Sequence, residues 1–243
     1  QIGAVVGSQP FGGEGLSGTG PKAGGPHYLR RFRKAGAAGA TPAAGKAVAA
    51  QTLREHMPDG ARGNWAARPD RIEVLRKHLR GKGAAAVAAA AAVEFGPVDL
   101  PGPTGESNTL LLAPRGRALC LGPDGEALLA QAIQALAAGN AVLAVAPGAR
   151  TALAPLVGKG LPLEALEGTV EPADLADLGV EVVASAAEPQ ALRQIRAALA
   201  SREGPLVRLV TAAIDPVAYA HERAVCVDTT AAGGNASLLA AAE

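Results

Sequence analysis

Short apolar runs and amphipathic stretches alternate along the second half of the chain. The apolar runs are typical of buried strands, and the amphipathic stretches are typical of helices that cover a sheet. We expect strands at 109–113, 117–121, 141–146, 179–184, 206–212 and 225–227, and helices at 125–138, 149–157 and 189–200. Continuously apolar strands that alternate with helices indicate a parallel sheet with both faces covered. The fold class predicted is α/β, with a Rossmann-like, mostly parallel sheet.

The region before this alternation is helical in pattern. Ile72, Leu75 and Leu79 recur at helical spacing, and Asn64 is placed to cap a helix that Pro69 interrupts near its start. Residues 84–93 form an Ala-rich helix or another buried segment, and periodicity does not decide between the two. Further on, residues 96–106 have the composition of a turn-rich connection. Gly139-Asn140 has the composition that ends a helix in a left-handed C-cap, and so closes the helix predicted at 125–138.

The first 34 residues differ from the remainder of the chain. They are rich in Gly and Pro, which disfavours a long helix and favours tight turns that approach a ligand or another backbone closely. Residues 35–50 are small and of low complexity, so we expect a linker there.

Composition and charge narrow the classes of function. The chain of 243 residues has 23 Lys and Arg against 22 Asp and Glu, a formal net charge of +1, which gives no electrostatic case for nucleic-acid or membrane-surface binding. Hydrophobic residues at 49% exclude a disordered chain, and aromatic residues at 2% require a core of Ala, Leu and Val. The longest apolar run, 84–93, is too short to span a bilayer. Two cysteines exclude a disulfide scaffold and favour a reducing, cytoplasmic setting.

Conventional catalytic patterns are weak in this sequence. Cys120 and Cys226 lie in apolar strands, so both are interpreted as small buried hydrophobic residues. The four histidines show no metal-ligand spacing, and no metal site is predicted. Gly13 to Gly18 matches G-x-G-x-x-G, but no strand precedes it and Gly20-Pro21 follows it, so we reject a dinucleotide fingerprint.

Two stretches carry more specific signals. Gly3 and Ala4 precede Val5-Val6 and leave backbone amides unobstructed by side chains, a nest that suits a carboxylate. Phe11, between Pro10 and two glycines, suits the wall of a small pocket, although a simple packing role stays open. At the other end, residues 225–239 combine a short strand, a Gly-Gly-Asn turn and an apolar tail, which suits a hook that pairs with another surface; a frayed tail is the alternative.

These stretches resemble the aldehyde dehydrogenase superfamily and, more narrowly, the proline utilisation A family of bifunctional proline dehydrogenase/L-glutamate-γ-semialdehyde dehydrogenase flavoproteins. The resemblance is carried by Gly3–Gly7 with Gln9–Pro26, by 229–238, and by Thr104–Thr109 with Pro114–Gly122. Since the first residue is not Met, we expect a C-terminal fragment of a longer enzyme. The resemblance implies four parts: 1–34 as the end of the semialdehyde dehydrogenase domain, 35–50 as linker, 51–224 as a non-catalytic Rossmann-like domain, and 225–243 as a motif packed on the dehydrogenase domain.

The resemblance also implies a chemistry. The whole enzyme would use FAD to oxidise proline and NAD to oxidise L-glutamate γ-semialdehyde, with the intermediate passing through a tunnel. Gly3 and Ala4 would hold the substrate carboxylate, and Phe11 would flank its carbon chain. The segment that seals the tunnel would contain Thr229, Thr230, Gly233, Gly234 and Asn235.

The family's catalytic Cys, its general base and its main cofactor folds match no part of this sequence. Cys120 and Cys226 do not fit the context of the nucleophile, so we expect the chain alone to be inactive and to bind neither NAD nor FAD. Its partners would be the upstream catalytic domains, and a homo-oligomer or peripheral membrane association of the whole enzyme stays open. Two alternatives remain, a stand-alone nucleotide-binding module and a purely structural lid or interaction domain.

Overall fold

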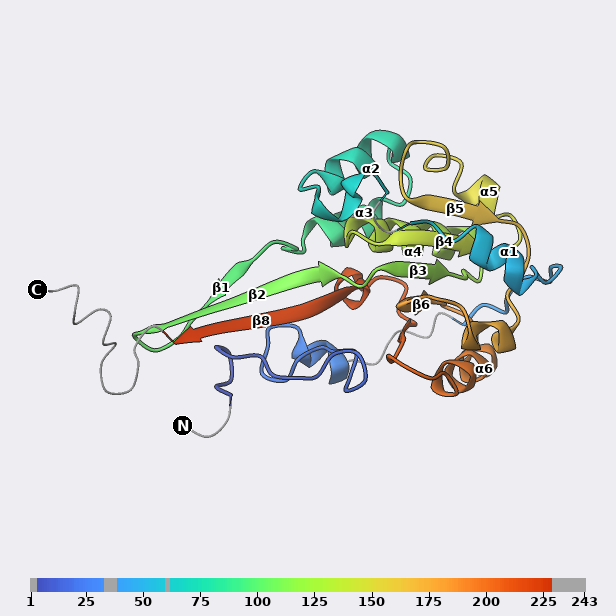
Figure 1. Cartoon of the computed structure of the whole chain (residues 1–243). Coiled ribbons are helices and arrows are strands. Elements are labelled where there is room, and N and C mark those ends of the chain that lie inside the picture. Colours follow the sequence, from blue (N-terminus) through green and yellow to red (C-terminus); the bar gives the residue numbers. More distant parts are fainter. Residues whose placement is uncertain (1–3, 33–38, 60–61, 229–243) are drawn as a thin grey trace, which may run out of the picture.

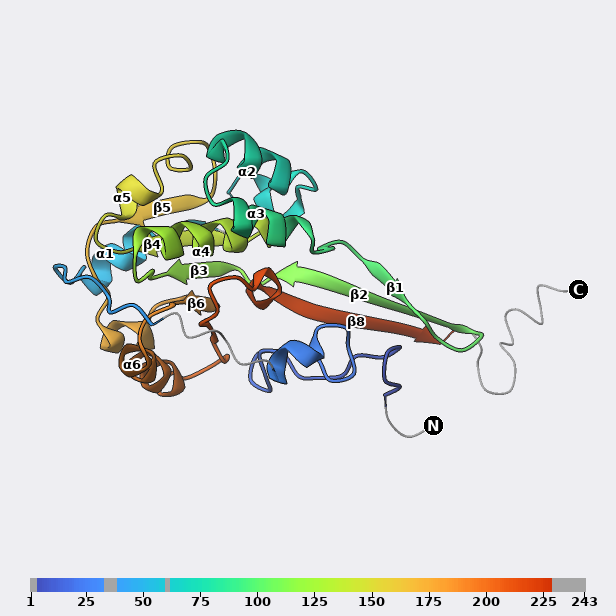
Figure 2. The same cartoon turned by 180° about the vertical axis from the view of Figure 1, so that it is seen from behind.

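The computed structural model describes residues 4–32, 39–59 and 62–228, and within it three parts are distinguished (Figure 1). A body is built around a parallel sheet. A long antiparallel flap projects from that body, and an N-terminal segment, residues 4–32, lies along the flap. Seen from behind, the N-terminal segment again follows strand β8 of the flap, so the two are neighbours in space (Figure 2).

The sheet of the body has five parallel strands in the order β5-β4-β3-β6-β7. The strands are β3 (Arg117–Cys120), β4 (Ala141–Val145), β5 (Leu163–Leu166), β6 (Val182–Ala184) and β7 (Arg208–Val210). Chain order runs outward from β3 to β5 and then returns to β6 and β7 on the other side of β3. This arrangement confirms the predicted Rossmann-like sheet and places a topological switch point between β3 and β6.

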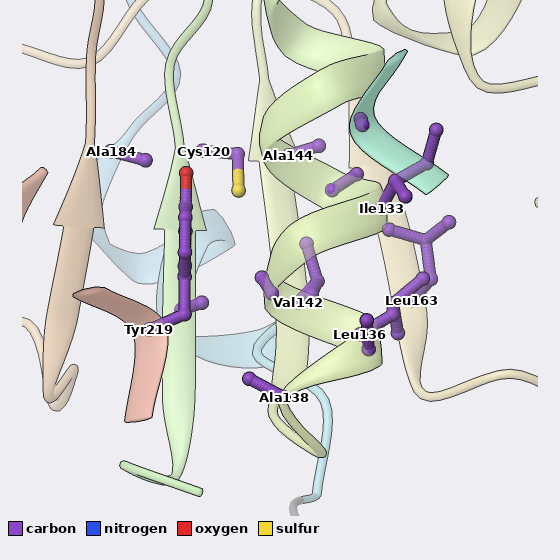
Figure 3. Close-up of a cluster of buried hydrophobic side chains, with 14 of the residues drawn as sticks. Cys120, Ile133, Leu136, Ala138, Val142, Ala144, Leu163, Ala184 and Tyr219 are labelled. Atoms are coloured by element: carbon purple, nitrogen blue, oxygen red, sulfur yellow. The ribbon is translucent and has the colours of Figure 1, made fainter. Parts of the chain in front are cut away.

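Alternation along the strands separates two hydrophobic cores. Cys120, Val142 and Ala144 face one core, whereas Leu119 and Leu143 face the other, because successive strand residues point to opposite sides of a sheet. Helices cover both faces: α2 (Arg71–Leu79), α3 (Ala84–Ala91) and α4 (Gly125–Ala137) lie on one, and α1 (Ala50–Glu55), the 3-10 turn η3 (Pro172–Ala176) and α6 (Pro189–Ala200) lie on the other. Small strand side chains face α4, and Tyr219 fills the remaining space beside Cys120 (Figure 3).

Local signals explain where α4 begins and ends. The Asp124 side chain accepts a hydrogen bond of 2.8 Å from the amide of Ala127, as an N-cap does. Gly139 follows the helix with φ of 91°, which is the left-handed C-terminal conformation that glycine adopts without strain. Both ends of this helix therefore agree with the sequence pattern.

The flap consists of three antiparallel strands, β1 (Val98–Leu100), β2 (Glu106–Pro114) and β8 (Ala220–Asp228). β2 pairs with β8 without interruption from Glu106 opposite Asp228 to Pro114 opposite Ala220. The remaining helices and turns are α5 (Ala149–Ala152), η1 (Tyr28–Phe32), η2 (Arg62–Ala67) and η4 (Pro216–Tyr219). In the part of the chain that the structure describes, no helix combines the length and apolarity needed to cross a bilayer.

Several sequence expectations need correction. Asn64 does not cap a helix; it lies inside a 3-10 turn with φ of 53°. The helix expected at 149–157 ends at Ala152, and the strand expected from residue 179 begins at Val182. The structure adds β1 and β5, which the sequence pattern does not predict, and β8 begins at Ala220 rather than Val225. The undecided segment 84–93 is helical as α3.

The described part of the expected linker, residues 39–50, is fixed to the body. Ala40 pairs with Ala187, and Ala47 pairs with Thr169, each through an isolated bridge. We call residues 39–48 the strap. Gly168 (φ 133°) lies so close to the strap that an added Cβ would overlap the carbonyl oxygen of Lys46. The strap therefore crosses the loops that follow the carboxyl ends of β5 and β6.

Candidate functional site

The predicted carboxylate-binding bend is a closed turn organised by Gln9. The Gln9 side-chain oxygen accepts a hydrogen bond of 3.1 Å from the amide of Val5, and the Val5 carbonyl accepts from the amides of Ser8 and Gln9 at 3.2 and 2.8 Å. Gly7, with φ of 84°, allows the reversal and donates to Gly24 at 2.9 Å. The side-chain amide of Gln9 also donates to Glu106 on β2 at 3.1 Å. The flap therefore fixes the position of the bend.

Two backbone amides of this bend stay open. Within the described residues, the amides of Ala4 and Val6 have no acceptor, and the Val6 side chain is 82% exposed. Ala4 is exposed as well, while Gly3 lies outside the described residues. These two amides therefore remain without an intramolecular acceptor in an exposed part of the segment.

Phe11 is held by its backbone and exposed by its side chain. Its amide and carbonyl exchange hydrogen bonds of 3.0 and 2.8 Å with Ala23. The ring is 73% exposed, so it closes no pocket formed by the described part of this chain. Five of the ten large apolar side chains that the structure describes as exposed lie in residues 4–32; they are Val6, Phe11, Leu16, Leu29 and Phe32. Five exposed apolar side chains in so short a segment are typical of a surface that packs against a partner.

Charged side chains join the N-terminal segment to the flap and body, a junction we call the seam. Arg115, which is 9% exposed, donates to the carbonyls of Thr19 at 2.7 Å and Ala218 at 2.9 Å. Glu222, 6% exposed, accepts from the amide of Lys22. The seam thus fixes the position of the segment on the flap and body, while its outer face stays open.

Burial within the seam changes its titration. Desolvation is the main cause that lowers the pKa of Arg115 to about 10. Desolvation, followed by the neighbouring Arg115 charge, lowers the pKa of His221 to about 4, so this imidazole is neutral at pH 7. Burial raises the pKa of Glu222.

Sequence reasoning missed the residues that build the seam. Arg115 lies in the Pro-Arg-Gly segment between the strands expected at 109–113 and 117–121, and Glu222 lies in a polar interruption before the expected last strand. A charged side chain in such a place is usually solvated. The only hint was that a charged group flanks an apolar strand at both places.

The carboxyl edge of the parallel sheet does not fit a dinucleotide. In Rossmann-type sites the amides of a helix N-terminus hold the pyrophosphate. Here the Glu167 carboxylate accepts from the amides of Gly148 at 2.6 Å and Arg150 at 2.9 Å, and these bonds lower the pKa of Glu167. At α4 the Asp124 carboxylate takes the first-turn amide. At the starts of α4 and α5 the chain's own carboxylates therefore occupy amides that phosphate would need.

The Gly13–Gly18 match also lacks the structure of a phosphate loop. It forms turns along the flap, and within residues 4–27 no strand precedes it and no helix follows it, which agrees with its rejection as a fingerprint. The strap adds a further obstacle, because it lies over the same carboxyl edge where a nucleotide would enter.

The two cysteines have different environments. Cys120 is fully buried, as expected, and burial raises the pKa of its thiol well above the usual range, so it is unfit as a nucleophile. Cys226 is exposed, which corrects the expectation that it is buried. Its position on β8 turns its sulfur toward the Gln9 amide at 3.3 Å rather than toward a core. In the described ranges, no three His, Cys, Asp or Glu side chains gather in a way that could hold a metal ion.

The residues expected to seal a tunnel lie outside the described part of the chain. These are Thr229, Thr230, Gly233, Gly234 and Asn235. The last described residue, Asp228, ends β8 at the tip of the flap (Figure 1).

Comparison with known proteins gives sequence relatives along nearly the whole chain. The bifunctional protein PutA of Escherichia coli (strain K12) is 37% identical over 98% of this chain and 18% of the relative. The bifunctional protein PutA of Rhizobium meliloti is 35% identical over 98% of this chain and 19% of the relative. The chain thus spans about a fifth of the length of the curated relatives it matches. No family model matches the chain.

Solved structures agree with the fold. A Bradyrhizobium japonicum proline utilization A (PutA) variant superposes with a TM-score of 0.57 at 23% identity, over 67% of this chain and 22% of that one. An aldehyde dehydrogenase from Brucella melitensis biovar abortus 2308 superposes with a TM-score of 0.51 at 19% identity, over 67% of this chain and 43% of that one. At these identities the likeness establishes the α/β fold.

Proposed function

The chain belongs to the proline utilisation A (PutA) family, and from this membership we propose that it is part of a bifunctional enzyme that oxidises proline to glutamate. The first reaction would be an FAD-dependent proline dehydrogenation, and the second an NAD-dependent oxidation of L-glutamate γ-semialdehyde. The described residues do not fit a dinucleotide, so both cofactors would be held elsewhere in the polypeptide.

Within that enzyme we propose the following division. Residues 1–34 complete the semialdehyde dehydrogenase domain, 35–50 connect it to the body, 51–224 form a non-catalytic domain, and 225–243 pack on the dehydrogenase domain. The division at 225 falls inside β8, which pairs with β2 through Asp228. The C-terminal motif would therefore start as the continuation of a flap strand.

The bend at the N-terminus would bind the α-carboxylate of the semialdehyde. Gly3 and Ala4 would donate backbone amides to it, because an oxyanion is stabilised by several amides aimed at one point. Gln9 would act as a positioning residue, since its side chain closes the bend and ties it to Glu106. Phe11 would flank the carbon chain and exclude water from it.

One observation carries this proposal, the outward-facing apolar surface of residues 4–32. Its side chains are exposed at 70–82%, although the seam fixes the backbone beneath them. A rigid apolar face of this kind is stabilised only when another surface covers it. In relatives several times longer than this chain, that surface is available from the rest of the polypeptide.

Substitution of Phe11 in the full-length polypeptide tests the proposed role. Phe11→Ala should raise KM for the semialdehyde, lower kcat, or both, with kcat/KM falling at least about tenfold, because a wall of the site is lost. Proline oxidation should be unchanged. Phe32→Ala is the matched control, since Phe32 is similarly exposed at 70% and lies outside the bend. Semialdehyde kinetics like those of the parent enzyme in Phe11→Ala would remove this residue from the site.

A truncation tests the proposed seal. Removing residues 229–243 keeps β8 intact, so the flap retains its full pairing with β2. Coupled conversion of proline to glutamate should slow and free intermediate should accumulate, while proline dehydrogenation alone is spared. Coupled rates that match the parent enzyme would argue against a seal in this segment.

A further inference from the structure

A small cavity in the seam has an unusual charge lining. It measures about 50 Å³ and lies between residues 19–31 of the N-terminal segment and the body near β7 and η4. That volume is several times what one water molecule needs, at roughly 10–15 Å³. Four arginines and two carboxylates line it: Arg30, Arg31, Arg115, Arg208, Asp215 and Glu222.

Most of these charges are already used. Asp215 accepts from Arg30 at 2.7 Å, and Glu222 accepts from the Lys22 amide. Arg115 directs its donors to backbone carbonyls and to His221. The Lys22 amide is uncharged, so Glu222 keeps its charge, which acts on the neighbouring Arg115. With Asp215 paired to Arg30 and Glu222 beside Arg115, two arginines of the lining remain in excess.

Arg208 and Arg31 are those two. Arg208 is partly buried; its single hydrogen bond within the described residues is a long one of 3.4 Å to the carbonyl of Gly20, and its buried Nε has no acceptor. The exposed side chain of Arg31 has no hydrogen bond or ion pair within the described residues. Desolvation lowers the pKa of Arg208, and the nearby Arg31 charge lowers it further, although Asp215 opposes this. A partly buried guanidinium with no anion bonded to it is costly, so a further negative charge in the cavity would stabilise Arg208.

We propose that this cavity binds a small doubly charged oxyanion of the phosphate or sulfate type, which bridges Arg31 and Arg208. Guanidinium groups present parallel N–H donors that match two oxygens of such an anion. A dianion would offset the excess of two positive charges in the lining, which a carboxylate monoanion would only half neutralise. His27, half-buried in the same lining with a lowered pKa, can donate a further hydrogen bond as a neutral imidazole.

The anion would also connect two parts of the molecule. Arg31 belongs to the N-terminal segment and Arg208 to β7 of the body, so a bridging anion crosses the seam. Binding should therefore raise the thermal stability of the docked segment, because a ligand that binds only the native state stabilises it. This inference does not depend on the proposed enzymatic function, since the binding is measured directly.

Titration of the full-length polypeptide with inorganic phosphate tests the site. In a chloride buffer of fixed ionic strength, calorimetry should show one saturable site per chain, and the melting temperature should rise with occupancy. Arg208→Gln and Arg31→Gln should each weaken the affinity at least tenfold. Arg31 lies on an exposed turn, so its variant keeps the test valid if Arg208→Gln does not fold.

Controls separate this site from general charge effects. Arg193→Gln removes the same charge from the exposed face of α6, outside the cavity lining, and should leave the affinity unchanged. Sulfate should compete with phosphate, and acetate should bind at least tenfold more weakly. Methyl phosphate distinguishes two sources of the anion. An affinity equal to that of inorganic phosphate assigns the site to the phosphate group of an ester, and much weaker binding assigns it to the free inorganic dianion. Absence of saturable binding, equal loss in Arg193→Gln, or equal affinity for acetate would overturn the proposal.

Discussion

The body and the N-terminal segment differ in how far their apolar side chains are exposed to solvent. In the body, strand residues such as Leu119, Val142 and Leu143 are fully buried between two layers of helices. In the N-terminal segment, Val6 and Phe11 are among the most exposed apolar side chains that the structure describes, although the backbone is well bonded. The body completes its own core, whereas the segment leaves its apolar side chains exposed on a well-bonded backbone.

The comparison shows that a segment can have a defined backbone position without burying its apolar side chains. The N-terminal segment owes its shape to polar contacts with the flap and body, through Arg115, Glu222 and Gln9. The body owes its shape to packing. Substitutions of apolar residues in the body should therefore lower the free energy of unfolding more than those on the exposed face of the segment. Substitutions on that exposed face should have the larger effect on function.

The largest expected effect is at Asn140, which connects the body to the base of the flap. Its buried side chain accepts from the amides of Arg115 and Gly116 and donates to the carbonyls of Ala135 and Tyr219. Asn140→Ala should lower the free energy of unfolding by about 3–5 kcal/mol, because several buried polar groups lose their partner. Urea denaturation measures this. Asn140→Asp loses the donors and sets a buried negative charge against the two carbonyls, so it should cost at least as much as Asn140→Ala. An Ala variant within about 1 kcal/mol of the parent would contradict this account.

The next effect concerns the pH dependence of the seam. The folded-state pKa of His221, about 4, is depressed below its ordinary 6.5, so the unfolded chain binds the proton first as pH falls. The contribution of the neutral imidazole to the free energy of unfolding should be complete above pH 6.5 and should be lost between pH 6.5 and about 4. The loss should reach up to about 3 kcal/mol, at about 1.4 kcal/mol per pKa unit. Arg115, Arg223, Lys22 and Glu14 are the charges that face this imidazole.

Denaturation curves at several pH values check that window. His27, whose pKa is also lowered, contributes in the same direction, so the informative quantity is the difference between the parent and His221→Gln. The variant should show a flatter dependence over the window. Identical slopes for both proteins would rule out His221 as the titrating group.

A smaller effect is expected where the strap meets the body. Gly168→Ala should cost about 2–3 kcal/mol, because it combines a positive φ with overlap against Lys46. Gly158→Ala has a positive φ of 72° and open space around it, so it should cost only about 1 kcal/mol. Urea denaturation measures both. Equal losses would mean that close approach of the strap contributes nothing.

The smallest effect tests the exposed face itself. Leu16 is 75% exposed, and Leu16→Ala should change the stability of the chain by less than about 0.5 kcal/mol. The same truncation at the fully buried Leu143 should cost about 2–5 kcal/mol. A loss of more than about 1 kcal/mol at Leu16 would show that this chain already covers the face, which would remove the contrast between the two regions.

The sequence pattern predicted secondary structure best where burial follows a regular repeat along a helix or strand. The run 141–146 is apolar because both faces of β4 are covered, and the limits of α4 follow from Asp124 and Gly139. It failed at β5, an edge strand, where Glu164 and Glu167 interrupt the apolar pattern. Edge strands tolerate such residues because one side remains accessible.

The candidate site was only partly predictable, for a different reason. The turn-forming glycines and Phe11 are local signals, and the structure places Ala4 and Phe11 on one exposed segment. The contacts that position this segment join residues about 90 to 200 positions apart, such as Arg115 with Thr19 and Lys22 with Glu222. No local pattern encodes such pairs, because they depend on how the flap is oriented against the body.

The pairing of β2 with β8 has a consequence for biosynthesis. β2 ends at Pro114, but its partner begins only at Ala220, so on a ribosome this strand emerges long before its neighbour exists. Closing such a long loop is slow compared with forming the nearby hairpin and helices. A nascent chain halted before residue 220 would expose the unpaired edge of β2 to other chains, so this strand would need protection from aggregation during translation.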